Sequence, residues 1–214
     1  MLAYKRNQVE GAIATVLEHT AEPSTELRTR LKRLLDTDRA AGRKVGASDP
    51  ERANYAFYSA DSPGSGVEVQ FSAYEAFALL TGLSLLHHGW PQGFVVALMR
   101  RMRPSLEKEH TRILKQDPKN LFDFEAIRRE AKPGDMAFNN TDPVLLTIVS
   151  KRGLERRQET EPHMWEICRG PARAMKFIVE SGGGAPGTMF ELVNVAHELV
   201  GALNSTTPQP RGRV

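Results

Sequence analysis

Cysteine is almost absent from this chain, and long apolar runs are absent altogether. The single cysteine, Cys168, cannot form an intramolecular disulfide or a zinc site built from several thiolates. Its isolation favours a reducing compartment. No stretch approaches the roughly 20 consecutive apolar residues that cross a bilayer, and the N-terminus lacks the apolar segment of a signal peptide. We therefore expect a cytoplasmic protein that does not enter a membrane.

A strong excess of charge of either sign is missing as well. The 29 lysines and arginines nearly balance the 26 acidic residues, which leaves a net charge of +3. Any surface for an acidic partner must therefore come from local clustering. The length of 214 residues, with 40% hydrophobic residues, suffices for one large or two small domains.

The order of the expected elements indicates an α-rich α+β fold in two parts. We predict a basic N-terminal unit over residues 1–116 and a smaller mixed α/β part over residues 117–204, with a disordered tail over residues 205–214. The sequence contains no internal repeat and no long low-complexity segment.

The middle of the chain carries the clearest local signals. Alternating apolar residues predict a strand over residues 67–71, and Ser72 and Glu75 form the capping box of the helix that follows. Gly89 ends this leucine-rich helix, and a second helix is expected over residues 92–103. A strand, a helix, a glycine corner and a helix occur in many folds, so this unit alone does not indicate a function.

Two amphipathic helices precede this unit, over residues 8–19 and from about Ser24 to residue 36. Residues 40–53 are small and polar and predict a loop. The apolar segment at residues 55–58 predicts a strand that pairs with the strand at residues 67–71, so that the two form a hairpin with a polar, glycine-containing tip.

The densest positive cluster in this half of the chain lies on the second helix and the loop after it. Between Thr25 and Lys44, seven basic residues stand against three acidic ones. Duplex phosphates attract clustered Lys and Arg, and arginine can also contact guanine edges. A solvated helical face that pairs with Glu26 and Asp36 is the alternative interpretation of the same charges. The candidate nucleic-acid-binding residues are Arg28, Arg30, Lys32, Arg33, Arg39, Arg43 and Lys44.

The order helix, basic helix, hairpin, helix, glycine corner, helix resembles a winged helix-turn-helix of the MerR type. The residues that carry the resemblance are Phe71, Glu75, Leu79 and Gly89, followed by apolar Phe94 and Val95. The resemblance implies that the hairpin at residues 55–71 is the wing, and that the basic helix enters the major groove with the helix at residues 8–19 supporting it. It also implies a long helix at residues 92–116 that reaches a dimer partner.

A second basic stripe is expected on that long helix, where it could face phosphates, partner helices or solvent. Its members are Arg100, Arg101, Arg103, Lys108, Arg112 and Lys115.

The C-terminal half resembles no known family, but several of its elements can be predicted. Residues 144–149 predict a buried strand, and residues 164–168 a second strand. Helices are expected over residues 171–180 and 188–203, and Thr188 and Glu191 supply a capping box for the latter. The apolar face of that last helix favours a role in dimerisation or in sensing.

No residue pattern indicates catalysis or metal binding. The adjacent His87 and His88 point in different directions on a helix, and Cys168 lies in an apolar setting without a local histidine base. The glycine-rich segment at residues 182–188 lacks the lysine of a phosphate-binding loop. We therefore expect no cofactor, no metal and no enzymatic activity.

These observations predict a homodimeric transcriptional regulator that binds double-stranded DNA through the basic helix and an adjacent wing. Whether a small-molecule effector binds is unknown from the sequence. The alternative is a non-enzymatic interaction or adaptor module, whose basic faces bind an acidic protein partner.

Overall fold

The computed structural model describes residues 3–59, 69–131, 133, 136–149, 164–182 and 187–206. Its fold is α+β and α-rich, as the sequence predicts, with small antiparallel sheets. No helix in the described part of the chain combines the length and apolar character needed to cross a membrane.

The chain divides into two compact units. The first unit comprises Met1–Lys108 and Glu198–Val214, and the second comprises Glu109–His197. The division falls inside α5 (Gln92–Leu114) and inside α9 (Val193–Ser205), the two helices that run from one unit into the other. The second half of α9 thus belongs to the first unit, whereas the sequence assigned the whole of this helix to the second part.

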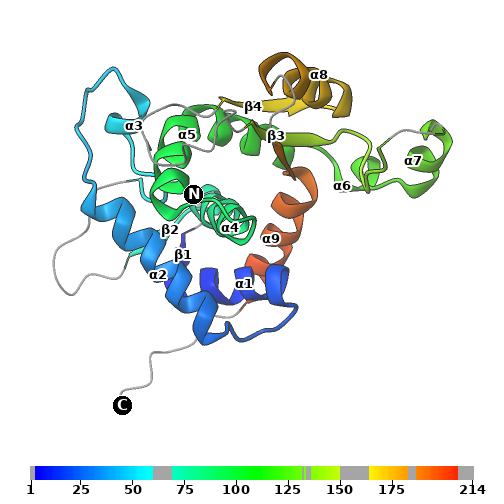
Figure 1. Cartoon of the computed structure of the whole chain (residues 1–214). Helices are drawn as coiled ribbons and strands as arrows, with labels where there is room; N and C mark the ends of the chain where they lie inside the picture. Colours follow the sequence, from blue (N-terminus) through cyan, green and yellow to red (C-terminus); the bar gives the residue numbers. More distant parts are fainter. Residues whose placement is uncertain are drawn as a thin grey trace. The chain divides into compact units, whose positions relative to one another are not determined.

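Helix α4 (Ala73–His87) forms the centre of the first unit. Almost all of its side chains are buried, and α1 (Arg6–Glu18) and α2 (Thr25–Ala40) contact it (Figure 1). The predicted capping box is present, because Ser72 Oγ accepts the Glu75 amide at 3.2 Å and the Glu75 carboxylate accepts the Ser72 amide at 2.7 Å. The predicted glycine corner is present as well.

The two ends of the described chain meet in this unit. Strand β1 (Tyr4–Lys5) pairs antiparallel with β2 (Gln70–Phe71). The Tyr4 hydroxyl donates to Asn204 Oδ1 at 3.5 Å, and Gln8 Nε2 donates to the Thr206 carbonyl at 3.2 Å. The C-terminal half of α9 therefore contacts the same N-terminal segment that completes the small sheet.

The predicted wing hairpin is wrong in its first strand. Residues 55–58 are not a strand, and β2 pairs with β1 instead of with them. All four of these residues are buried, so they do not alternate between two faces as a half-exposed strand does. The expected tip lies outside the described residues, and a short helix, α3 (Pro50–Ala53), forms within the expected loop.

Side chains take the place of a strand partner for this segment. The Asp38 carboxylate accepts the amides of Ala56 and Phe57, each at 3.0 Å. The same carboxylate binds Arg100 Nε at 2.6 Å, and Asp38 and Arg100 are only 0% and 4% exposed. Arg100 also donates to the Gly42 carbonyl at 2.7 Å. This buried ion pair therefore joins the end of α2, the segment after α3, and α5.

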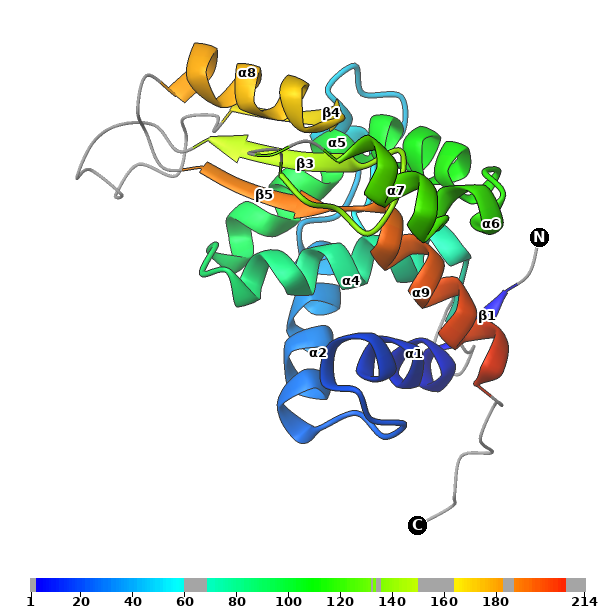
Figure 2. The same ribbon diagram turned by 90° about the vertical axis from the view of Figure 1, so that its right-hand side faces the viewer.

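In the second unit, a three-stranded antiparallel sheet packs against a helix (Figure 2). Its strands are β4 (Met164–Arg169), β3 (Val144–Val149) and β5 (Gly187–Glu191), in that spatial order. Helix α8 (Pro171–Gly182) contacts β3 and β4. As predicted, all six residues of β3 are buried. The short helices α6 (Pro118–Leu121) and α7 (Phe124–Glu130) precede the sheet.

The helix predicted over residues 188–203 starts later than expected. Its first residues form β5, and α9 begins at Val193. Glu191 still caps the helix, because its carboxylate accepts the amides of Val193 and Asn194 at 2.9 and 2.8 Å. Thr188 is therefore part of the sheet and not the N-cap.

We expect Asp38→Ala to lower the free energy of unfolding by about 3–5 kcal/mol, because it leaves the Arg100 charge buried without its partner. Urea unfolding followed by circular dichroism measures this loss. Asp36→Ala, on the exposed side of the same helix, is the matched control and should change stability by no more than about 0.5 kcal/mol. Equal effects of the two substitutions would contradict the role given to Asp38.

Candidate nucleic-acid interface

Helix α2, which carries most of the candidate basic residues, packs against the rest of the first unit. Ser24 Oγ caps the helix by accepting the Leu27 amide at 3.1 Å. One stripe of α2 is buried against other elements of the first unit, and it contains all the buried side chains of the helix. The stripe consists of Leu27, Leu31, Leu34, Leu35 and Asp38. Because the buried residues occupy a single stripe, all the basic side chains of α2 lie outside it.

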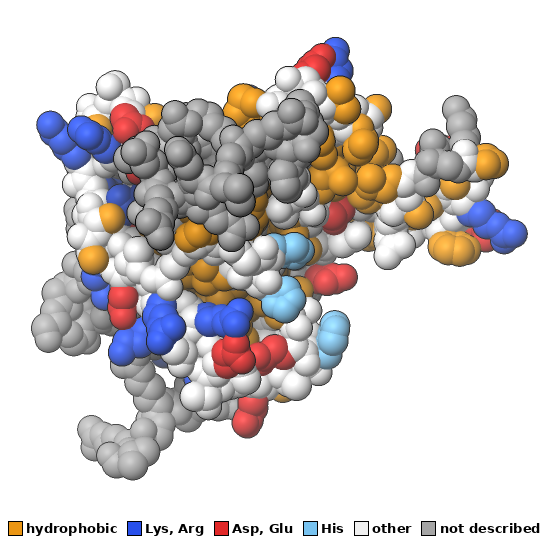
Figure 3. All heavy atoms as spheres, viewed as in Figure 1, with side chains coloured by type: hydrophobic (Ala, Val, Ile, Leu, Met, Phe, Trp, Pro, Cys, Tyr) orange, Lys and Arg blue, Asp and Glu red, His pale blue; other side chains and the backbone are white. Residues whose placement is uncertain are grey.

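The seven predicted residues differ in how they are held. Arg28, Lys32, Arg33 and Lys44 are exposed and form no ion pair with any described residue. Arg30 binds Glu26 at 2.5 Å across one helical turn, which is the pairing that the solvated-face interpretation describes. Lys and Arg side chains lie beside acidic ones over α2 on the face drawn in Figure 3.

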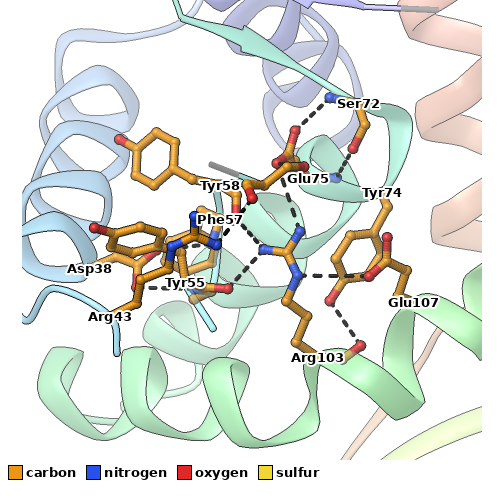
Figure 4. Close-up of polar contacts among 12 residues, drawn as sticks. Asp38, Arg43, Tyr55, Phe57, Tyr58, Ser72, Tyr74, Glu75, Arg103 and Glu107 are labelled. Carbon is orange, nitrogen blue, oxygen red and sulfur yellow. Dashed lines mark hydrogen bonds and ion pairs between the residues drawn. The ribbon is translucent and has the colours of Figure 1, made fainter. Parts of the chain in front are cut away.

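Arg39 and Arg43 are held against aromatic rings. The Arg39 guanidinium lies 5.2 Å from the centre of the Tyr58 ring and donates to the Tyr58 hydroxyl at 3.2 Å. The Arg43 guanidinium lies 5.4 Å from the Tyr55 ring and donates to the Ser59 carbonyl at 3.4 Å (Figure 4). Burial raises the pKa of Tyr58 to about 12, so this phenol stays neutral at physiological pH. Such cation–π contacts restrict the positions of both guanidinium groups.

A second buried arginine holds the two tyrosines in place. Arg103 Nη1 donates to the carbonyls of Tyr55 and Tyr58 at 2.8 and 2.5 Å. Its guanidinium also lies 3.8 Å from the Glu75 carboxylate, which accepts the Ser59 hydroxyl at 2.5 Å (Figure 4). Side chains of α4 and α5 therefore form hydrogen bonds with residues 55–59, the segment predicted as the first wing strand and the residue after it.

The second basic stripe predicted on α5 does not exist as an exposed surface. Arg100 and Arg103 are buried and bind backbone carbonyls and carboxylates. Arg101 pairs with Glu51, and Arg112 pairs with Glu109 and Asp142. Only Lys108 and Lys115 of that stripe are exposed. Charge and helical spacing identified the basic residues but not the direction in which they point.

Sequence reasoning missed the buried residues that position the candidate interface, although part of the signal is present. Asp38 follows Leu31, Leu34 and Leu35 at helical spacing, which places it on the buried stripe of α2. A carboxylate at such a position requires a buried cationic partner. The sequence does not reveal that the partner is Arg100, because the two residues are far apart in the chain.

Groups suited to other chemistry are not assembled. Among the described residues, no three His, Cys, Asp or Glu side chains could hold a metal ion together. Cys168 is buried, and burial raises the pKa of its thiol, which disfavours the nucleophilic thiolate. His163 and most of the glycine-rich segment, residues 183–186, lie outside the described residues.

Comparison of the chain with protein-family models and with curated proteins found no match.

His110 gives the protein a testable response to acid. Burial, and less strongly the charge of His197, lower the pKa of His110 from 6.5 to about 4. The unfolded chain therefore binds this proton first as the pH falls below 6.5, and stability is lost between pH 6.5 and 4. The free energy of unfolding should fall when the pH is lowered from 7 to 4.5. We expect this fall to be about 2–3 kcal/mol smaller in His110→Gln than in the wild type. Urea unfolding at the two pH values measures the difference, and parallel losses would show that His110 titrates normally.

Proposed function

We propose that this chain is a cytoplasmic, DNA-binding regulator of transcription that contacts the duplex through the exposed sides of α2. The observation that carries the proposal is the single buried stripe of α2, which leaves its basic side chains outside the core. The loop after the helix adds Arg43 and Lys44. In this proposal the helix order is like that of the MerR type, but the contact does not depend on a hairpin wing.

The composition of the exposed sides of α2 favours nucleic acid over the acidic protein partner of the adaptor alternative. Apart from Ala40, every exposed residue of α2 is polar or charged, and none of the large exposed apolar side chains belongs to this helix. The centres of protein interfaces are usually apolar and rich in aromatic residues, whereas interfaces with DNA are polar and basic. Phosphate contacts need only the charges that α2 provides.

A homodimer is part of the proposal, but its contact surface differs from the one expected. The apolar face of α9, which suggested dimerisation, is buried within the chain. Its buried residues are Val193, Ala196, Leu199, Ala202 and Leu203. This face therefore stabilises the monomer's own fold, and the dimer needs another surface.

The main test removes four positive charges from α2 by Arg28→Gln, Arg30→Gln, Lys32→Gln and Arg33→Gln. We expect duplex affinity to fall at least tenfold at 0.1 M salt, and the salt dependence to become shallower by up to about 0.9 log units for each phosphate that the protein no longer neutralises. Fluorescence anisotropy with a labelled random-sequence duplex, at two or more salt concentrations, measures both quantities.

The matched control removes four exposed charges from the second unit by Lys115→Gln, Lys119→Gln, Arg128→Gln and Arg129→Gln. This variant should bind DNA within about threefold of the wild type, because it removes the same total charge but leaves every residue of α2 in place. Equal losses of affinity in both variants would mean that only the net charge attracts DNA. Tighter binding of polyglutamate than of duplex would favour the adaptor alternative.

A gain of binding provides an independent test, since it cannot result from misfolding. Asp36 is exposed on α2 and repels phosphate. For a unit charge about 6 Å from a phosphate in water, its removal is worth about 0.7 kcal/mol. We therefore expect Asp36→Asn to tighten duplex binding roughly threefold in the same anisotropy assay. Unchanged or weaker binding would place the duplex elsewhere on the molecule.

A further inference from the structure

The basic residues of α2 lie on two separate flanks of the helix. At 3.6 residues per turn, Arg28, Lys32 and Arg39 lie within roughly 40° of one another around the axis. Measured from the middle of that group, Arg33 lies about 120° away and Arg30 about 180° away around the axis. The first three residues therefore form one straight row, the Arg28 row, and the other two form the opposite flank.

Local contacts distinguish the two flanks. On the opposite flank, Glu26 already pairs with Arg30. The side chain of Gln92, at the start of α5, donates to Thr37 Oγ1 at 2.6 Å and to the Arg33 carbonyl at 3.4 Å. Another part of the first unit therefore lies alongside this flank. In the Arg28 row, Arg28 and Lys32 are exposed and form no ion pair with any described residue.

The third member of the Arg28 row is oriented in advance. Tyr58 is only 8% exposed, and its ring and hydroxyl both contact the Arg39 guanidinium. The Asp38 carboxylate accepts the amide of the preceding residue, Phe57, and Arg103 donates to the carbonyl of Tyr58. A guanidinium held in this way loses less side-chain freedom when it binds a phosphate.

We propose that the side chains of the Arg28 row bind the phosphates of one DNA strand, and that Tyr58 positions Arg39 for this contact. At 1.5 Å per residue, the row extends for about 16 Å, enough for three contacts along a backbone with one phosphate every 3.4 Å of axis. Three contacts correspond to a log–log salt slope of about −3. This inference rests on the proposed DNA-binding function and assigns that function to one flank of α2.

Two charge-reversal pairs with the same change in net charge test the row. Arg28→Glu with Lys32→Glu should weaken duplex binding more than tenfold at 0.15 M salt, where the Debye length is about 8 Å, and should reduce the salt slope by about two. Arg30→Glu with Arg33→Glu should weaken it less than threefold. Thermal unfolding of both variants checks that each is folded.

The outcomes separate this inference from the function on which it rests. Equal losses of affinity in the two pairs, or a larger loss in the Arg30 and Arg33 pair, would overturn the row while duplex binding itself stands. Wild-type protein that shows no salt-dependent duplex binding would overturn both. Binding to single-stranded DNA that exceeds duplex binding, with the same row required, would overturn the duplex as the partner.

The positioning role of Tyr58 has a readout that needs no DNA. In the unliganded full-length protein, the NMR signal of the Arg39 Nε–Hε group should carry a ring-current shift, which Tyr58→Phe keeps and Tyr58→Leu removes. Tyr58→Leu should also reduce the salt slope by about one. An Arg39 signal at the position of an exposed arginine in the wild type would show that the ring does not hold it.

Discussion

The ion pair between Asp38 and Arg100 is the interaction on which the arrangement of the first unit depends. Both groups are removed from water, which is costly unless each finds good partners. Here the carboxylate binds two backbone amides besides the guanidinium, and the guanidinium binds backbone carbonyls. The pair therefore does more than join α2 to α5, since it also fixes a segment without regular secondary structure against both helices. Tyr55 and Tyr58 take their positions from this segment.

Much of the local structure could be predicted from the sequence. The capping box of Ser72 and Glu75, the helix that begins after Ser24 and the buried strand at residues 144–149 all depend on neighbouring residues, and all are present. The hairpin could not be predicted correctly, because strand pairing is decided by distant partners. Tyr4 and Lys5 pair with β2, while the amides of Ala56 and Phe57 bind a carboxylate.

The candidate interface was predicted in composition but not in geometry. A count of arginines treats Arg28, Arg30 and Arg103 alike, whereas one is exposed, one is paired on the helix surface and one is buried. The difference comes from which side of each helix meets the core, and for α5 the buried side includes arginines as well as apolar residues. Helical periodicity alone does not anticipate a buried arginine, because its partners come from other elements.

The first unit is built from two distant pieces of the chain, and this has a consequence for its biosynthesis. Leu199 and Leu203 are buried, and Asn204 and Thr206 bind residues near the N-terminus. A ribosome must therefore synthesise the chain as far as residue 206 before these contacts can form. Until then, the nascent N-terminal segment leaves apolar surface uncovered, a state in which chaperones bind. Under this constraint, β1 and the start of α1 complete their contacts only after residue 206 has been synthesised.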